Sequence, residues 1–420
     1  MLDVRFIRDN AALVKEAVHN KNEKADIDRI LELDAQKRKL QFDYDTKRAE
    51  QNRVSKQVPI LKKQGLDASG LIAEMQKIAA EVKAIGQTLG EITAQLDAAL
   101  LVVPNVPHPS VPIGRDESDN ELVHEWGEKR KFDFVPKDHL ALADGKLLDF
   151  KRPAKLTGSG FAGYTGVGAL LERALINFML DFHVQKHGYN EISLPYIVSR
   201  TTMTGTGQLP KLEDDMYHIS EDDLFLIPTA EVPVTNYYAN EILKNDQIPQ
   251  KFVAYSPCFR REAGSYGKDT KGLQRLHQFN KVEMVRFSEP DVSYDVLEEM
   301  VRDAEDLLQA LELHYRVVTL ATGDLSFASA KTYDLEVWAP GTGRYLEVSS
   351  VSNFEAFQAR RANIRYRDAN DKVSYVHTLN GSGLATPRTF IALIETWQNA
   401  DGSISIPEAL RPYLYGMEQI

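Results

Sequence analysis

Hydrophobic residues in the first hundred positions of the chain recur at alternating steps of four and three. The pattern is clearest at Leu71, Met75, Ile78, Val82, Ile85, Leu89, Ile92, Leu96 and Ala99. This spacing lines one side of a helix and is typical of a coiled coil. An earlier stretch repeats at steps of seven, at Leu33, Leu40, Val54 and Leu61, with Lys47 at the missing step. The sequence therefore predicts two long helices.

Residues 64–70 separate the two helical patterns and include Gly65 and Gly70. Glycines in such a segment favour a turn, and Asp67 or Ser69 is suited to cap the second helix. Two long helices joined by a short turn must run antiparallel, so we expect a hairpin over about residues 27–100. Because a helix rises ~1.5 Å per residue, each arm should be roughly 50 Å long.

The exposed face of the first predicted helix is rich in charge. Its basic residues are Lys37, Arg38, Lys39, Lys47, Arg48, Arg53, Lys56, Lys62 and Lys63, and the acids interleaved with them are Asp34, Asp43, Asp45 and Glu50. Charges of both signs are typical of a solvated face. Composition alone favours a dimerisation coiled coil over an RNA-binding arm, and both interpretations stay open.

Prolines are dense over residues 103–112 and cannot continue a helix, which indicates a domain joint. Beyond it, residues 168–187 and 291–313 read as helices, and residues 252–256, 281–287 and 345–350 read as strands. Long insertions break any regular alternation of strand and helix. We therefore predict an α+β fold: the N-terminal helical hairpin over residues 1–103, then a mixed, mainly antiparallel sheet flanked by helices over residues 104–420.

Composition narrows the class of protein. The chain has 420 residues, of which 43% are hydrophobic, and a formal net charge of −11, so overall charge gives no sign of nucleic-acid binding. Its one cysteine, Cys258, excludes an internal disulfide and is interpreted as a buried apolar residue. We expect no membrane span and a cytoplasmic location, because no segment approaches ~20 consecutive apolar residues and the N-terminus has no apolar core.

Candidate chemistry lies in the second part of the chain. It lacks a glycine-rich phosphate loop, so a bound nucleotide would need side-chain cations such as Arg260 and Arg388. Phe279 and Arg388 could hold an adenine ring between them, although core packing alone also explains Phe279. Glu347 and Ser350 supply oxygen ligands that suit Mg²⁺, or they are an ordinary edge-strand pair.

An amino acid would need acids and small polar groups. Thr229, Ala230 and Glu231 follow an apolar run, and Glu231 and Glu283 could receive an ammonium or a hydroxyl group. Ser382 lies between Gly381 and Gly383, which would let a ligand approach closely. On local grounds the same glycines favour an ordinary turn.

Taken in order, these segments resemble class II aminoacyl-tRNA synthetases. Residues 257–285 resemble motif 2 with its loop, residues 378–394 resemble motif 3, and residues 165–195 resemble motif 1, the dimer-forming element. The Thr229-Ala230-Glu231 triplet is similar to the serine-binding loop of seryl-tRNA synthetases. The resemblance to that family covers essentially the whole chain, including the hairpin and the lack of a C-terminal anticodon-binding domain.

The resemblance implies a serine–tRNA ligase that forms seryl-adenylate from L-serine and ATP and transfers the seryl group to the 3′ end of tRNA(Ser), with tRNA(Sec) as a possible second acceptor. It implies Mg²⁺, a homodimer, and tRNA binding through the hairpin. It carries over catalytic roles to Arg260 and Arg388, and Mg²⁺ binding to Glu347 and Ser350. The implied serine-binding residues are Thr229, Ala230, Glu231, Arg260, Glu283 and Ser382. The implied ATP-binding residues are Arg260, Arg261, Glu262, Arg275, Phe279, Glu347, Val348, Ser349, Ser350 and Arg388.

Two positions depart from the family pattern: Arg261 stands where a smaller residue is common, and Thr386-Pro387 replaces a Val-Gly pair. Two other functions stay open. One is a ligase that loads an amino acid onto a carrier protein, and the other is a non-catalytic coiled-coil scaffold with a relic ligase body. The complete hairpin argues against the first, and the full set of Arg260, Glu283, Glu347 and Arg388 argues against the second.

Overall fold

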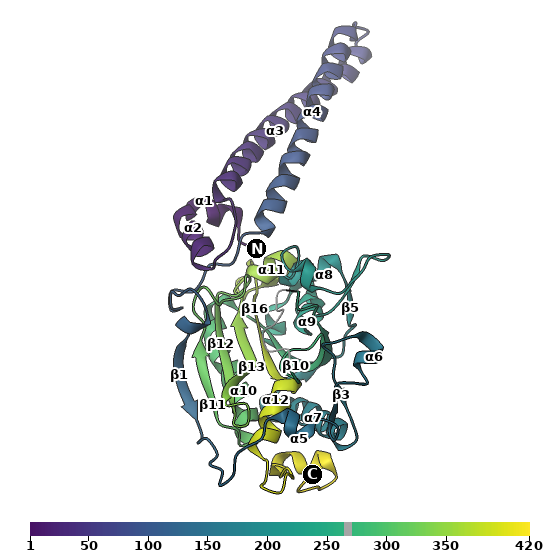
Figure 1. The fold of residues 1–420 in the computed structure, drawn as a ribbon. Helices are drawn as coiled ribbons and strands as arrows, with labels where there is room; N and C mark the ends of the chain where they lie inside the picture. Colours follow the sequence, from purple (N-terminus) through teal and green to yellow (C-terminus); the bar gives the residue numbers. More distant parts are fainter. Residues whose placement is uncertain (264–270) are drawn as a thin grey trace. The chain divides into compact units, whose positions relative to one another are not determined.

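The structure is a computed structural model that describes residues 1–263 and 271–420. The chain divides into two units (Figure 1). One comprises Leu2–His19 and Glu23–Pro104, and the other comprises Met1, Asn20–Asn22 and Asn105–Ile420.

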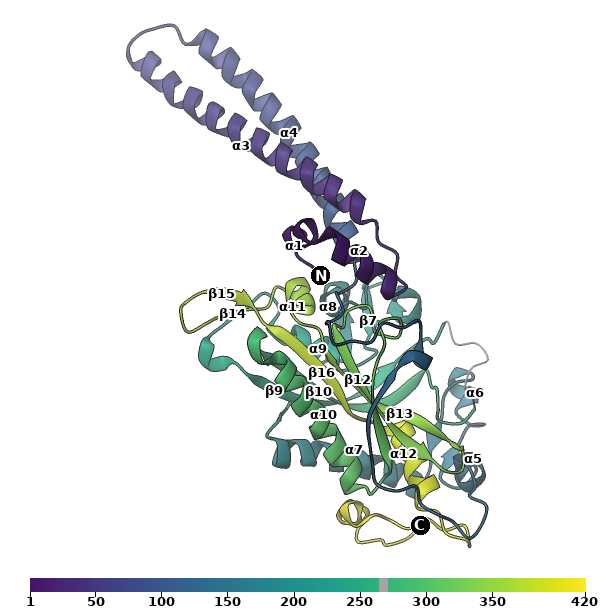
Figure 2. The same cartoon turned by 90° about the vertical axis from the view of Figure 1, so that its left-hand side faces the viewer.

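The first unit is the predicted helical hairpin. Two short helices, α1 (Val4–Asp9) and α2 (Ala11–Asn20), precede the long helices α3 (Ile27–Lys63) and α4 (Ser69–Leu101), which run antiparallel (Figure 2). Val54, Ile78 and Val82 are buried between the long helices, as the spacing of hydrophobic residues predicted.

Lys47, which interrupts the hydrophobic repeat, lies at the seam between α3 and α4. Its Nζ atom is 2.9 Å from the Glu81 carboxylate on the facing helix and 3.2 Å from the Glu50 carboxylate. The ion pair therefore lets a lysine occupy a position that the repeat assigns to a leucine. The aromatic ring of Tyr44 lies against Gly86, where an added Cβ atom would come within 3.2 Å of it.

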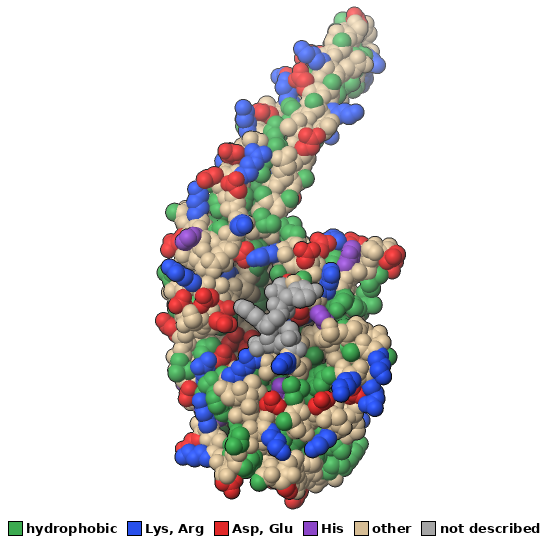
Figure 3. All heavy atoms as spheres, in the orientation of Figure 1, with side chains coloured by type: hydrophobic (Ala, Val, Ile, Leu, Met, Phe, Trp, Pro, Cys, Tyr) green, Lys and Arg blue, Asp and Glu red, His purple; other side chains and the backbone are tan. Residues whose placement is uncertain are grey.

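One expectation about the charged face of the hairpin was wrong. Asp34 is buried, and its carboxylate accepts hydrogen bonds from Arg8 of α1 at 2.9 Å and from Arg38 at 3.0 Å. It fastens α1 to α3 and does not belong to the solvated face. Elsewhere on the hairpin, basic and acidic side chains are interspersed (Figure 3).

The second unit is built on an eight-stranded sheet in the order β1-β11-β12-β13-β16-β10-β9-β4. All neighbours pair antiparallel except β4 and β9, so the predicted mixed, mainly antiparallel sheet is confirmed. The strands of this sheet are β1 (Glu121–Trp126), β4 (Asn190–Glu191), β9 (Gln250–Phe259), β10 (Gln278–Ser288), β11 (Tyr315–Thr319), β12 (Lys331–Ala339), β13 (Arg344–Asn353) and β16 (His377–Ala385).

Three helices cover one face of this sheet and form the main core with it: α7 (Val167–His187), α10 (Ser293–Ala310) and α12 (Thr386–Thr396). Helix α10 lies across the sheet in Figure 2 and packs on β16 and β13. Side chains of adjacent strand residues point to opposite faces, so Val282 and Met284 of β10 enter this core while their neighbours face the other side.

Smaller elements surround the sheet. The helices are α5 (His139–Ala143), α6 (Ala154–Thr157), α8 (Arg200–Thr206), α9 (Glu231–Thr235) and α11 (Phe357–Ala362), with short 3₁₀ turns at Glu117–Asp119, Glu213–Asp215, Asn236–Tyr238, Asn245–Gln247, Pro290–Val292 and Glu408–Leu414. The minor strands are β2 (Leu148–Asp149), β3 (Gly163–Tyr164), β5 (Ile197–Ser199), β6 (His218–Ile219), β7 (Leu224–Leu226), β8 (Ile242–Leu243), β14 (Arg365–Arg367) and β15 (Val373–Tyr375). Among the helices of the described residues, none combines the length and the apolar character that crossing a bilayer requires.

Candidate active site

A cleft of about 780 Å³ opens on the face of the sheet opposite the main core. Strands β10, β13 and β16, the start of α12 and the segment before α9 contribute to it. The predicted site residues that line it are Thr229, Glu231, Arg260, Glu262, Arg275, Phe279, Glu283, Glu347, Val348, Ser350, Ser382 and Arg388. Residues far apart in the sequence thus meet in one cavity.

Within the described part of the chain, three predicted site residues do not line this cleft. The side chain of Arg261 is exposed, while its backbone N–H donates to the Asp215 carbonyl oxygen at 2.9 Å. Ala230 and Ser349 are buried, and the Ser349 hydroxyl donates to the Ser382 carbonyl oxygen at 2.6 Å. Residues 264–270 of the expected motif 2 loop lie outside the described residues.

The alternation of strand β10 explains which of its side chains reach the cleft. Phe279, Lys281 and Glu283 are spaced by two and all line it. Lys281 was not among the predicted site residues, although the same alternation indicates it. Its Nζ atom forms an ion pair with the Glu283 carboxylate, and both side chains are buried.

A β-bulge brings the proposed metal ligands together. Across β12 and β13, Leu335 pairs with Ser349 and Glu336 pairs with Glu347, which leaves Val348 as an extra residue. In a regular strand two residues three positions apart face opposite sides, but one inserted residue returns them to the same side. Glu347 and Ser350 therefore both line the cleft.

A second bulge shapes strand β16. Lys281 pairs with Ala385 and Glu283 pairs with Ser382, so Gly383 and Leu384 oppose the single residue between the two partners. The interpretation of Gly381 and Gly383 as an ordinary turn was wrong, because both lie within this strand. An added Cβ atom on Gly383 would come within 2.2 Å of the buried His183 ring, so close packing requires glycine there.

Acidic groups at one part of the cleft are held by buried partners. The Glu231 carboxylate accepts a hydrogen bond from Gln358 Nε2 at 2.7 Å, and Gln358 Oε1 accepts one from the Thr378 hydroxyl at 2.7 Å. Burial and the neighbouring Glu283 carboxylate raise the pKa of Glu231 to about 7. Sequence reasoning missed Gln358, since nothing local links residue 358 to residue 231.

Cationic groups line another part of the cleft. Arg388 Nη1 lies 2.9 Å from the Glu347 carbonyl oxygen and 3.2 Å from the Glu347 carboxylate. Arg275 is paired with Glu262 at 2.7 Å. The Arg260 guanidinium lies 5.1 Å from the centre of the Phe279 ring, and its Nε donates to the Pro228 carbonyl oxygen at 3.3 Å. These contacts hold each guanidinium group in a defined position.

Asp334 of β12 lies beside Glu347 and is the cross-strand partner of Ser350. It is buried, its Oδ1 atom has no hydrogen-bond partner in the described structure, and burial and the Glu347 charge raise its pKa well above the usual range. Mg²⁺ prefers oxygen ligands and commonly takes one or two carboxylates together with substrate phosphates. Glu347 and Ser350, with Asp334 behind them, therefore fit this ion.

Comparison with known proteins identifies the family. The family model of the tRNA synthetase class II core domain (G, H, P, S and T) matches residues 212–397, and that of the seryl-tRNA synthetase N-terminal domain matches residues 1–107. The serine–tRNA ligase of Thermoanaerobacter pseudethanolicus is 54% identical, over 99% of this chain and 98% of that protein. The chain belongs to the seryl-tRNA synthetases. It is an ATP-dependent ligase that joins serine to tRNA, as its resemblance to this family implied.

Solved structures of the family agree with this fold. A seryl-tRNA synthetase from Pyrococcus horikoshii, complexed with ATP, matches with a TM-score of 0.92 and 38% identity, over 100% of this chain and 99% of that one. A cytoplasmic serine–tRNA ligase from Naegleria fowleri, in complex with AMP, matches with a TM-score of 0.87 and 26% identity, over 100% and 98% of the two chains.

Proposed function

We propose that the cleft binds serine beside Glu231 and Glu283, binds ATP beside Phe279 and Arg388, and brings the two reactants together at Arg260. The observation that supports this most directly is that Arg260, Glu283, Glu347 and Arg388 all line one cavity. They are contributed by the end of β9, by β10, by β13 and by α12. A guanidinium group that can bind both a carboxylate and a phosphate suits the junction between the reactants.

In the serine half, Thr229 and Glu231 would receive the α-ammonium group, and Glu283 with Ser382 would receive the hydroxyl group. The pairing of Ser382 with Glu283 across β10 and β16 supports a joint role. Ala230 would act through the backbone that it shares with Thr229 and Glu231. A site built to bind a hydroxyl group rejects alanine because its own polar groups would stay unpaired.

In the ATP half, Phe279 and Arg388 would stack on the two faces of adenine, and Glu262 would orient the nucleotide. Arg275 would contact the phosphates. Arg261 and the backbone of Val348 and Ser349 would complete the rim of the site. Planar cations stack on flat rings as well as bind anions, which supports the role of Arg388.

Mg²⁺ would be held by Glu347 and Ser350, and when bound it would neutralise phosphate charge. A serine carboxylate oxygen attacks the α-phosphorus of ATP, the new O–P bond forms, and the bond to pyrophosphate breaks. The terminal ribose 3′-hydroxyl oxygen of tRNA then attacks the seryl carbonyl carbon and AMP leaves. Arg260 and Arg388 would contribute by positioning the reactants and by stabilising charge at phosphorus, and we assign no residue as general base.

The test is serine-dependent exchange of pyrophosphate into ATP, assayed with each proteinogenic amino acid. We expect exchange with serine only, and its loss in Arg260→Ala and Arg388→Ala variants that remain folded. Near-normal exchange by a folded Arg260→Ala protein would contradict the assignment. Exchange by another amino acid would contradict the serine half alone.

We also propose residues 1–103 as a domain that binds tRNA(Ser) through the hairpin and residues 104–420 as the catalytic domain, in a cytoplasmic homodimer. Replacing residues 28–96 with a short glycine linker should preserve exchange but cripple charging of tRNA. If the shortened protein charges tRNA normally and becomes a monomer, the hairpin serves dimerisation instead. Charging assays with tRNA(Ser) and tRNA(Sec) determine the range of acceptors, and cell fractionation tests the location.

A further inference from the structure

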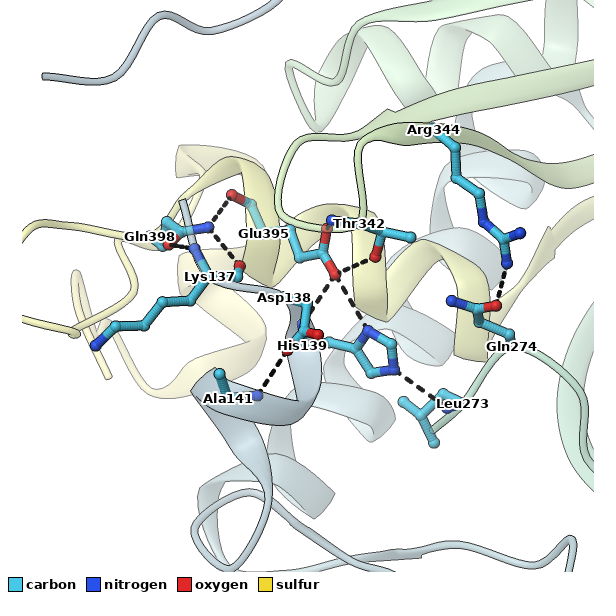
Figure 4. Close-up of polar contacts among 10 residues, drawn as sticks. All are labelled: Lys137, Asp138, His139, Ala141, Leu273, Gln274, Thr342, Arg344, Glu395 and Gln398. Atoms are coloured by element: carbon cyan, nitrogen blue, oxygen red, sulfur yellow. Dashed lines mark hydrogen bonds and ion pairs between the residues drawn. The ribbon is translucent and has the colours of Figure 1, made fainter. Parts of the chain in front are cut away.

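A buried histidine–carboxylate pair, His139 and Glu395, lies outside the residues assigned above (Figure 4). Glu395, near the end of α12, is 0% exposed and His139, at the start of α5, is 2% exposed. The Glu395 carboxylate accepts hydrogen bonds from the backbone N–H of His139 at 2.9 Å, from His139 Nδ1 at 3.1 Å, and from the hydroxyl and N–H groups of Thr342 at 2.7 and 2.8 Å. These hydrogen bonds replace those to water that the carboxylate loses on burial.

The partners of His139 determine which tautomer the ring adopts. On one side of the ring a Glu395 oxygen is the acceptor, so Nδ1 carries the proton and donates a hydrogen bond to it. On the other side of the ring, the backbone N–H of Leu273 points at Nε2, at 3.4 Å. A backbone N–H can only donate, so Nε2 must be the acceptor. The ring therefore links Glu395 to the backbone of Leu273 through one hydrogen bond on each side.

Gly272 confirms how closely the ring lies against this backbone. A Cβ atom added to Gly272 would come within 2.0 Å of His139 Nε2. The backbone of Gly272 also has a φ angle of +71°, which side chains with a Cβ atom adopt at a cost. The segment Gly272–Leu273 is thus held directly on the imidazole ring.

The residues that follow carry contacts into the ATP half. The Gln274 carbonyl oxygen accepts a hydrogen bond from Arg388 Nε at 3.3 Å, and the Gln274 side chain accepts one from Arg344. Arg275 is the next residue. Helix α12 therefore contacts this segment at two points: directly through Arg388, and through Glu395 and His139. Arg388 and Glu395 are seven residues apart, about two helical turns, so they lie on one side of the helix.

We propose that His139 is a positioning residue for ATP: by holding the backbone of Leu273 against α12, it sets the positions of Arg275 and Arg388. The proposal rests on the ATP roles given above to those two arginines. It concerns the described residues 271–276 and α12 only. A second attachment beside these helices does not involve His139: the Gln398 side chain, just after α12, bonds both the N–H and the carbonyl oxygen of Lys137, just before α5, at 2.8 and 2.9 Å.

The decisive variant is His139→Asn, tested in the full chain by pyrophosphate exchange. Asparagine can place an amide N–H near the position of Nδ1 and so keep the bond to Glu395, but it cannot reach Leu273. We expect the KM for ATP to rise about fivefold to tenfold, the effect of losing one buried hydrogen bond. The KM for serine should stay near the wild-type value, while the Tm should fall slightly, because a smaller side chain replaces a buried ring. An unchanged KM for ATP, or an equal rise for both substrates, would overturn the proposal.

His139→Gln supplies a matched comparison, because glutamine can place an amide oxygen near the former Nε2 and accept from Leu273. We expect it to restore most of the affinity for ATP while lowering the Tm, since the bond to Glu395 is lost. His377→Asn is the control: His377 bonds Ser293 at 2.8 Å and does not line the cleft. It should leave both KM values unchanged. Failure of His139→Gln to improve on His139→Asn would count against the proposal.

Gly272→Ala tests the same contact from the other side and covers the case in which His139→Asn does not fold. It should raise the KM for ATP, and an unchanged value would overturn the proposal. In the double variant His139→Asn/Gly272→Ala, the combined effect should be smaller than the product of the two single effects, because both break one contact. Arg388→Ala separates the two levels of inference: if it retains normal ATP affinity, the proposed ATP site itself is wrong, and if it loses ATP while His139→Asn does not, only the role of His139 is wrong.

Discussion

The hairpin and the cleft each contain a lysine–glutamate pair, one between two helices and one within strand β10, and the two pairs differ in burial. Lys47 and Glu81 meet across the hairpin with side chains that are 37% and 39% exposed. Lys281 and Glu283 meet in the cleft with side chains that are 8% and 2% exposed. Water and salt screen the first pair, whereas each charge of the second pair needs the other to offset the loss of water. Removing a single charge should therefore have little effect on the hairpin and a large effect in the cleft.

The largest effect should come from the cleft arginines. Arg260→Ala and Arg388→Ala should each lower pyrophosphate exchange by about two orders of magnitude or more, because each loses a charge-assisted contact. Circular dichroism and Tm should remain close to the unmodified protein, since both side chains line a cavity and are not part of the core. A large drop in Tm would instead assign these arginines to the fold.

The two ion pairs can be compared directly by removing one partner from each. Glu283→Ala leaves Lys281 buried and unpaired, which should lower the free energy of unfolding by about 3–5 kcal/mol. Its KM for serine should rise far more than its KM for ATP. Glu81→Ala is the matched variant in the hairpin and should leave Tm and exchange nearly unchanged. Equal losses of serine and ATP affinity in Glu283→Ala would contradict the assignment of this residue to serine.

The raised pKa of Glu231 predicts a pH dependence. The native state holds this proton more tightly than the unfolded chain, so the contribution to stability is complete below the ordinary pKa of about 4.3 and is lost as pH rises through about 7. The ionised form should bind the ammonium group, so the KM for serine should fall as pH rises toward 7. Glu231→Gln should abolish both dependences. A serine KM that varies with pH in the same way in Glu231→Gln would assign the titration to another group.

The smallest effect on catalysis should come from the hairpin. Lys39, Arg48, Arg53 and Lys56 are exposed on α3, and changing all four to glutamine should weaken tRNA binding and flatten its salt dependence. Exchange should be unchanged. Lys77→Gln with Lys83→Gln on α4 is the control for loss of exposed charge. Equal weakening by both sets would mean that the hairpin attracts tRNA through its overall charge and not through one face.

The sequence predicts the hairpin well because its helices follow a repeat that local spacing records. It predicts the presence of strands β9, β10 and β13 but places their ends a few residues short. The register between strands depends on contacts across the sheet, which no single segment encodes.

The same distinction separates the site residues that the sequence predicts from those that it does not. Residues in compact motifs, such as Arg260 and Glu283, are predictable because each motif occupies adjacent positions. Gln358 and His139 are not, since each acts on a residue that is more than a hundred positions away in the chain. Lys281 was within reach, because it shares the alternation of Phe279 and Glu283.

The bulge at Val348 has a consequence for how this region of the chain tolerates changes in length. Removing one residue beside it would restore regular pairing between β12 and β13 and would turn either Glu347 or Ser350 to the opposite face. Removing two neighbouring residues from a strand preserves the facing of the rest, so losses of one and of two residues should differ in kind. An insertion or deletion of an even number of residues in β13 should therefore be tolerated better than one of an odd number. A single deletion should be rescued by a compensating single insertion nearby.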